Sequence, residues 1–430
     1  MEKTISVFGI FCFLGFAFLL SNNKKKVDYK FIISGVLLQF VLAISVLGIP
    51  ALNFSGPLRP LFKSANIFFT AILNFTGKGT EFLFGNLMNI EKSGFIIAFQ
   101  VLPVIIFLSA LMAVLYHLKI MQKVVHVFAW FMHKTLKVSG AESLAAAANV
   151  FVGQTEAPLI IKPFINKLTR SELFSVMVGG MATVAGSVFA AYVGLLKDKI
   201  PDIAGHLLTA SVLSAPAALV IAKILIPETQ KTETDMGIPD EHNESPYQNM
   251  IEAAAQGATD GLKLMFNVAA MLLAFIALIA MANAGLGYIG SLIGFESWGG
   301  FLSFNPNEAP TLSLNLIFSW IFAPVAWLMG IPNQDIFMAA NLLGEKVVIN
   351  EFVAYLNMSA IADQLQPRSL IILSYALCGF ANFSSIAIQI GGIGGIAPTR
   401  KTEVAFLGIK AIIGGSLAAF ITACIAGLFI

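Results

Sequence analysis

Charged residues are scarce in this sequence. Asp, Glu, Lys and Arg make up 12% of its 430 residues, whereas a soluble globular domain carries about 25%. Hydrophobic residues make up 57%, and they gather in blocks of spanning length that a soluble core does not need. This composition excludes an ordinary soluble protein and predicts an integral membrane protein.

Patterns for disulfides, metals and nucleic acids are also missing. The three cysteines, Cys12, Cys378 and Cys424, lie in apolar segments without motif spacing, so we interpret them as buried small hydrophobic residues. The five histidines form no ligand pattern, and no cofactor is expected. The net charge of +2 comes without a basic tract, so nucleic acid is not an expected partner.

Eight apolar blocks are long enough to cross about 30 Å of hydrocarbon. They predict an all-α polytopic membrane protein with spans over 5–20, 31–49, 95–116, 173–196, 207–226, 262–284, 370–396 and 404–430. Lys24, Lys25 and Lys26 follow the first block, where a secretory signal would have a cleavage site, so this block is expected to be retained. The Lys/Arg bias of the loops places these lysines in the cytoplasm and both termini outside.

Two further segments connect the early spans. Residues 53–89 are mixed in character and contain Pro57, Pro60 and Gly77, which favours an external surface excursion. Residues 117–138 have lysines and aromatic side chains in a pattern that predicts an amphipathic helix on the cytoplasmic face.

Two other segments, 140–168 and 333–360, are moderately apolar but contain polar residues at their centres. The first contains Gly153-Gln154-Thr155-Glu156-Ala157-Pro158, where Gly and Pro disfavour an unbroken helix. The second contains Asn350-Glu351 within an apolar setting. We interpret both as re-entrant helical hairpins, which enter and leave on one side of the membrane.

A span with polar residues follows each hairpin at the same distance. Glu156 precedes Ser187 by 31 positions, and Glu351 precedes Asn382 by 31. Because a single span separates the two units, the second is inverted relative to the first, as in secondary transporters. The predicted division is an N-terminal scaffold (1–138), a first transport repeat (139–226), a linking region with a cytoplasmic loop, a span and an external segment (227–330), and a second transport repeat (331–430).

The two glutamates are costly at membrane depth. A charge at the bilayer centre costs about 2.5–3.5 kcal/mol on insertion scales, so Glu156 and Glu351 should face a wet cavity or a partner such as Lys162 or Lys346. Hydroxyls and amides nearby either join helices or line the same cavity. A cavity with amides, hydroxyls and two carboxylates suits a neutral, hydroxyl-rich solute. A passive channel is a competing interpretation, whereas no motif of an intramembrane enzyme is present.

Three motifs closely resemble the signatures of the concentrative nucleoside transporters. They are the segments 153–158, 350–355 and 378–385, and the resemblance covers essentially the whole chain in the length of the bacterial form. It implies a homotrimer in the bacterial cytoplasmic (inner) membrane that imports nucleosides such as uridine, driven by sodium. Some bacterial relatives use protons instead, in which case Glu156 would be a plausible proton carrier.

The resemblance also implies site residues. Nucleoside-binding positions carried over by motif are Gln154, Thr155 and Glu156 for the base, Val188 and Phe380 for the walls of the pocket, and Glu351, Asn382 and Ser385 for the ribose. Sodium ligands carried over by position are the side chains of Asn149, Thr183 and Ser187 and the backbone carbonyls of Val152 and Val184. Oxygen ligands of this kind suit a hard cation. Thr183 stands where some members have serine, which keeps the hydroxyl and adds a methyl group.

Overall fold

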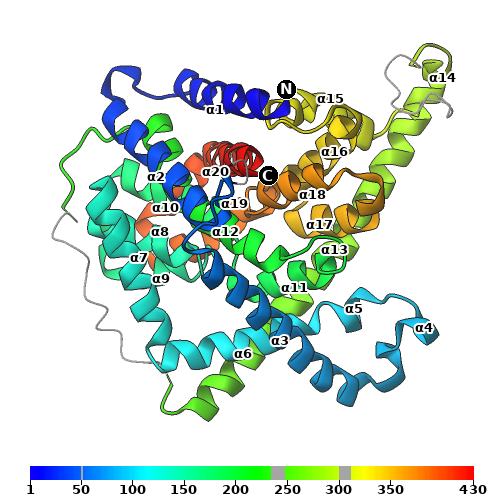
Figure 1. The fold of residues 1–430 in the computed structure, drawn as a ribbon, viewed down its shortest axis with the longest axis horizontal. Coiled ribbons are helices and arrows are strands. Elements are labelled where there is room, and N and C mark those ends of the chain that lie inside the picture. The colour runs from blue at the N-terminus through cyan, green and yellow to red at the C-terminus, as the bar shows by residue number, and fades with distance from the viewer. Residues whose placement is uncertain (50–51, 234–246, 300–310) are drawn as a thin grey trace.

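The computed structural model of the chain describes residues 1–49, 52–233, 247–299 and 311–430 (Figure 1). Within these ranges the regular elements are helices, and the one isolated β-bridge joins Ile49 to Phe54. The predicted all-α class is therefore confirmed. Within the predicted linking region (227–330), residues 234–246 of the cytoplasmic loop and 300–310 of the external segment lie outside the described residues.

Seven helical stretches of the described chain are long and apolar enough to cross a membrane. They are α1 (Glu2–Leu19), α2 (Tyr29–Leu47), α5 and α6 (Ile97–Gln100 and Pro103–His117), α10 and α11 (Arg170–Ala182 and Gly186–Leu196), α12 (Ile203–Leu225), α13 (Met250–Leu292) and the stretch Pro398–Phe429, which holds η8 (Pro398–Arg400) and α20 (Lys401–Phe429). They coincide with seven of the eight predicted spans. The span predicted over 370–396 consists of two shorter helices, α18 (Pro367–Ala376) and α19 (Phe383–Ile396), with a break between them.

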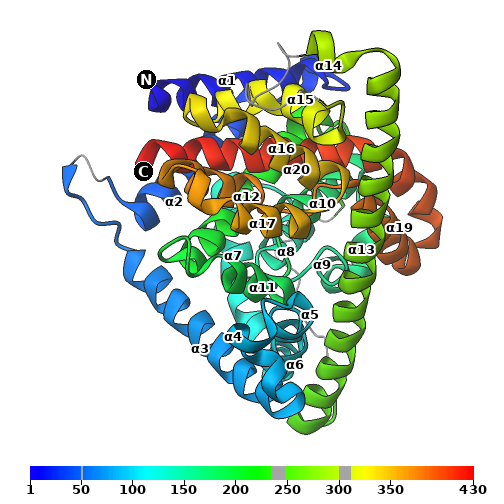
Figure 2. The same ribbon diagram turned by 90° about the vertical axis from the view of Figure 1, so that its right-hand side faces the viewer.

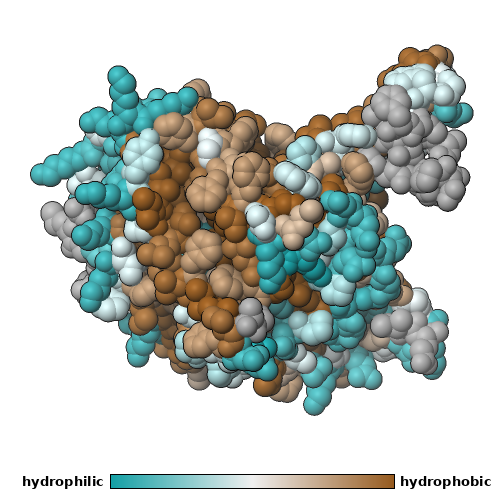
Figure 3. Space-filling view, turned by 45° about the horizontal axis from the view of Figure 1, so that its top comes forward, coloured by the Kyte–Doolittle hydropathy of each residue, from teal (hydrophilic) through white to brown (hydrophobic). Residues whose placement is uncertain are grey.

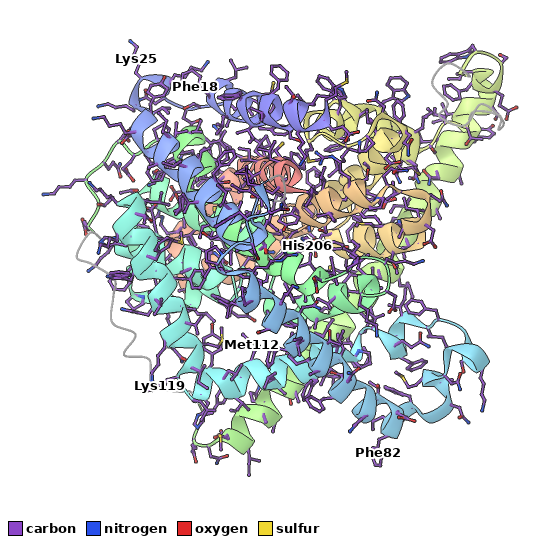
Figure 4. All side chains as sticks on the ribbon, in the orientation of Figure 1. Phe18, Lys25, Phe82, Met112, Lys119 and His206 are labelled. Carbon is purple, nitrogen blue, oxygen red and sulfur yellow. The ribbon has the colours of Figure 1, made fainter. Side chains whose placement is uncertain are left out.

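The segment predicted as a surface excursion is mostly one helix. α3 (Arg59–Phe84) is 26 residues long; Pro60 lies in its first turn, where no backbone donor is lost, and Gly77 does not interrupt it. Phe82, at the far end of α3, is 87% exposed and projects away from the body of the molecule (Figure 4). η3 (Gly85–Met88) and α4 (Ile90–Ser93) complete this lobe.

Two sets of elements then follow in the same order. The first set is α7 (Ile120–Leu136), α8 (Gly140–Asn149), α9 (Ala157–Ile160), η4 (Lys162–Lys167), α10, α11 and α12. The second set is α15 (Leu314–Leu328), η6 (Asn333–Asp335), α16 (Ile336–Val348), α17 (Glu351–Ala360), η7 (Ala362–Gln364), α18, α19 and α20. In each set a helix precedes the segment predicted as a hairpin and packs on its first arm: α7 packs on α8, and α15 packs on α16. The apolar helix α15 lies where only an external segment was expected.

Burial separates the helices of the repeats from those at the periphery. α20 crosses the centre of the molecule and packs against α1, α10, α12 and α18 (Figure 1). Most of α12 and α20 is buried, whereas α13, with α14 (Phe295–Trp298) after it, runs along one edge and is largely exposed (Figure 2). Figure 3 shows a broad hydrophobic surface flanked by hydrophilic residues. An apolar surface of this extent fits contact with lipid rather than with water.

Candidate functional site

The tip of the first hairpin is an irregular turn between α8 and α9. α8 ends at Asn149, and α9 begins at Ala157 with Pro158 in its first turn. The carboxylate of Glu156 accepts a hydrogen bond from the backbone N–H of Gly153 at 2.7 Å, which closes the turn. Thr155 and Glu156 are exposed residues, although the chain around them is apolar.

The tip packs against the break between α10 and α11. The backbone N–H of Gly186 donates to the carbonyl of Phe151 at 3.0 Å, which ties the start of α11 to the hairpin. Before the break, the Thr183 hydroxyl donates to the carbonyl of Gly179 at 2.9 Å. Ser187 lies in the first turn of α11. Hairpin and broken helix thus form one junction.

Asn149 brings an unsatisfied amide to this junction. Its side chain is 1% exposed, and neither amide atom has a hydrogen-bond partner in the described part of the chain. A Cβ built on Gly179 would lie 3.3 Å from Asn149 Nδ2, so the amide faces the last turns of α10 beside Thr183. A buried polar group without a partner costs about 1–3 kcal/mol. The buried backbone at Val152 and Val184 adjoins the same junction, and such oxygens suit a hard cation.

The second hairpin holds a carboxylate between two donors. Glu351 is the first residue of α17, and Asn350 caps that helix by accepting from Val353 N–H at 2.9 Å. Tyr192 Oη donates to Glu351 Oε1 at 2.8 Å, and Asn382 Nδ2 donates to Glu351 Oε2 at 2.9 Å. The carboxylate is buried and linked to both broken helices, α10–α11 and α18–α19.

The orientation of the Asn382 side chain is fixed because it also caps a helix. It is the N-cap of α19, where its Oδ1 accepts from the backbone N–H of Ser385 at 2.9 Å and from the Ser384 hydroxyl at 2.7 Å. This cap directs the amide nitrogen toward Glu351. The Ser385 hydroxyl accepts from Gln154 Nε2 at 2.9 Å, across the two repeats. Gln154, Ser385, Asn382 and Glu351 therefore form one connected polar chain.

The side chains of Phe380, Val188 and Thr155 lie around this polar chain, and no hydrogen bond from them to it is found among the described residues. Phe380 is half-buried in the break before α19, where its carbonyl accepts from Asn382 N–H at 2.8 Å. Val188 is buried in the first turns of α11, one turn before Tyr192. The backbone of Thr155 lies 3.7 Å from a Cβ built on Gly392, so the first hairpin also touches α19.

Sequence reasoning missed Gln389 and Tyr192. Gln389 Nε2 donates to Gln154 Oε1 at 3.1 Å and to the carbonyl of Met177 at 2.9 Å, so it orients the Gln154 amide. Gln389 lies four positions after Ser385, on the same face of a helix, and an amide there in an apolar span was a usable signal. Tyr192 had no comparable signal, because its partner is 159 positions away.

The alternative of glutamate–lysine ion pairs is not supported. Among the described residues no salt bridge includes Glu156 or Glu351. Lys162 is exposed, and Lys346 Nζ donates to the carbonyl of Ala376 at 2.7 Å instead. In the described part of the chain, neither carboxylate is therefore neutralised by a lysine within ion-pair distance.

A cavity of about 560 Å³ lies elsewhere in the molecule. It is formed by the ends of α2 and α20 and the beginnings of α3 and α12, and it is lined by Arg59, Asp202 and His206 among others. His206 is labelled in Figure 4 near the centre of the view. None of the predicted site residues lines this cavity, so it adds nothing to the candidate site.

Comparison with known families gives a consistent result along the chain. Residues 8–87 match the model described as Na+ dependent nucleoside transporter N-terminus, residues 98–199 match the one described as nucleoside recognition, and residues 206–427 match the Na+ dependent nucleoside transporter C-terminus. The matches cover both hairpins and both broken helices.

Individual relatives and solved structures agree with these family matches. An uncharacterized transporter of Haemophilus influenzae is 43% identical, over 100% of this chain and 98% of that protein. Human solute carrier family 28 member 3 is 36% identical, over 99% of this chain and 60% of that protein. The structure of CNTnw in an inward-facing substrate-bound state superposes with a TM-score of 0.88 at 40% identity, over 100% of this chain and 98% of that one.

Proposed function

Because the chain belongs to the family of Na+-dependent, concentrative nucleoside transporters, we propose that it is a symporter that imports nucleosides across the bacterial cytoplasmic membrane, driven by a sodium gradient. The observation that carries this proposal is the polar chain from Gln154 through Ser385 and Asn382 to Glu351. It joins side chains of both hairpins and of a broken helix, as expected for a substrate site between inverted repeats.

The side chains of the polar chain match the two parts of a nucleoside. A primary amide both donates and accepts, so Gln154, with Thr155 and Glu156 beside it, suits the edge of a nucleobase. A carboxylate accepts from paired hydroxyls, so Glu351, with Asn382 and Ser385, suits the ribose. Val188 and Phe380 supply apolar walls for the ring faces.

The coupling sodium ion is assigned to the first junction. Its proposed ligands are Asn149, Thr183 and Ser187 with the carbonyls of Val152 and Val184, and the unsatisfied amide of Asn149 supports the assignment. The junction adjoins the hairpin tip that bears Gln154. Sodium bound there would hold the tip in place, which raises nucleoside affinity, and by linkage the nucleoside raises sodium affinity by the same factor.

Uptake of labelled uridine into proteoliposomes tests the proposal. We expect accumulation above the external concentration that depends on an inward sodium gradient. Accumulation would exclude a passive channel. Uptake driven equally well by a proton gradient without sodium would favour proton coupling, for which the carboxylate of Glu156 is the candidate carrier.

The topology and assembly belong to the same proposal. We infer eight crossings, counting α18–α19 as one broken span, two re-entrant hairpins, both termini outside and a homotrimer. The exposed apolar side chains of α13 supply a surface for lipid or for a second copy. Native mass spectrometry of the detergent-solubilised protein is expected to show a mass of three chains, and a monomer would contradict this assembly.

A further inference from the structure

The side-chain amide of Gln154 is held at both ends by residues of one helix. Its Nε2 donates to the Ser385 hydroxyl at 2.9 Å, and its Oε1 accepts from Gln389 Nε2 at 3.1 Å. Ser385 and Gln389 are four positions apart in α19, so they lie on the same face of that helix. Gln154 is 5% exposed and Gln389 is 1% exposed. The two ends of the amide therefore have separate partners, both of them buried.

A backbone carbonyl determines the orientation of this amide. Gln389 Nε2 also donates to the carbonyl of Met177 at 2.9 Å, and a carbonyl oxygen can only accept. Gln389 must therefore direct its nitrogen, and not its oxygen, toward Gln154. If the Gln154 amide turned over, its nitrogen would meet the nitrogen of Gln389, and a buried hydrogen bond would be lost. The Ser385 hydroxyl imposes no such direction, because a hydroxyl can donate or accept.

A glycine in α10 lets both glutamines approach the carbonyl of Met177. A Cβ built on Gly180 would lie 2.8 Å from the Cβ of Gln154 and 3.3 Å from Gln389 Nε2. Met177 lies three positions before Gly180 in the same helix. A larger residue at position 180 would displace the two side chains from that carbonyl. The direction of the Gln154 amide is therefore set by the packing of the hairpin tip between α10 and α19.

The hairpin tip supplies a hydrogen-bond acceptor close to this donor. Gln154 Nε2 has two N–H groups, and the Ser385 hydroxyl is the one acceptor found for them among the described residues. Glu156 lies two positions further on, and its Oε2 accepts from the backbone N–H of Gly153. An ionised carboxylate can only accept, whereas the Thr155 hydroxyl between them can do either. The tip thus offers a donor at position 154 and an acceptor at position 156.

We propose that Gln389 is a positioning residue that turns the nitrogen of Gln154 toward the base, so that the site prefers nucleosides whose base has a carbonyl next to a ring N–H. The inference rests on the proposed function. Uracil has a carbonyl on each side of its N3–H, and guanine and hypoxanthine have one such pair. Cytosine and adenine carry an amino group next to a ring nitrogen that accepts, which is the reverse pattern. Such a base would place donor against donor and acceptor against acceptor.

Uridine and cytidine test this preference, because they share the sugar and the ring size and differ only at C4 and N3. Isothermal titration of each into the purified wild-type protein, at saturating sodium, is expected to give a dissociation constant about tenfold lower for uridine, since the reversed edge leaves polar groups unpaired. Constants within about twofold, or tighter binding of cytidine, would overturn the inference and leave nucleoside transport intact. Binding of neither nucleoside would overturn the proposed function, and the inference with it.

Gln389→Leu tests the positioning role. Without its partner, the Gln154 amide can turn over to suit either base, so the ratio of the two constants is expected to fall from about ten to about two. Gln39→Leu is the matched control, because Gln39 is a buried glutamine of α2 whose Nε2 donates to the carbonyl of Gly35. It should keep the wild-type ratio. A general loss of stability would weaken both nucleosides alike, so an unchanged ratio in Gln389→Leu would refute the positioning role.

Discussion

Replacing Glu351 by Gln isolates the contribution of its charge. The carboxylate accepts from Tyr192 at 2.8 Å and from Asn382 at 2.9 Å. The Asn382 amide cannot turn over without giving up the helix cap, which is worth about 0.5–2 kcal/mol. The new side-chain amide must therefore place its oxygen toward Asn382 and its nitrogen toward Tyr192, whose hydroxyl rotates to accept. Each neighbour keeps one hydrogen bond to residue 351, so the fold is expected to persist.

The loss of the Glu351 charge should then weaken the binding of the substrate. A hydrogen bond to a charged group contributes about 1.5–3 kcal/mol, which corresponds to about 10- to 150-fold in affinity. Isothermal titration of uridine into the purified protein, with a thermal unfolding curve beside it, measures both quantities. A dissociation constant within about twofold of wild type would show that Glu351 does not contact the substrate.

The chain contains a matched control for this substitution. Glu345 is 6% exposed and, like Glu351, accepts from two side chains, Asn341 at 3.0 Å and Asn357 at 2.9 Å. The Asn341 oxygen has no partner among the described residues, so that amide can turn over at little cost. Glu345→Gln is therefore expected to leave uridine affinity and uptake unchanged. If it lowered uridine affinity as much as Glu351→Gln does, the effect would not be specific to Glu351.

Four further changes have distinct expected outcomes. Glu156→Gln should abolish or greatly reduce uptake in proteoliposomes while the unfolding temperature stays unchanged. Asn149→Ala should raise the sodium concentration needed for half-maximal uptake without altering nucleoside preference in competition assays. Gln389→Leu should weaken uridine binding about 2- to 10-fold by titration, because it removes one neutral hydrogen bond that orients the side-chain amide of Gln154, which we propose to contact the base. Lys223→Met leaves the carboxylate of Glu142, 2.7 Å away and buried, without its cation, and should lower the free energy of unfolding by about 3–5 kcal/mol with little change in uridine affinity.

The turn between α8 and α9 and the two helix breaks were predictable because their signals are local. Gly153 and Pro158 mark the turn of the first hairpin, and the equal spacing from each hairpin glutamate marks the break that follows. Helix α3 was missed because its buried positions, Phe62, Ile72 and Thr76 among them, are spread through a segment of mixed polarity. Helix α15 has only 15 residues and contains Pro324, so it lacks the length by which a span is recognised.

The site was predictable only in part, because its contacts join distant positions. The family motifs indicate Gln154 and Ser385, yet their hydrogen bond spans 231 positions and no local pattern predicts it. The role of Gln389 depends on that pairing, so it could not be inferred from α19 alone. Asn149 was indicated by resemblance, whereas the absence of any partner for its amide is a three-dimensional property.

At the proposed site, the hydrogen bond between Gln154 and Ser385 would limit the affinity for a substrate. A solute that inserts between these side chains must first separate them, so each contact it gains replaces one that the empty protein already had. The net gain in binding free energy at this position is therefore the difference between the new hydrogen bonds and the one that is broken. This suits a transporter, because a substrate of moderate affinity can dissociate on the other side of the membrane within one transport cycle.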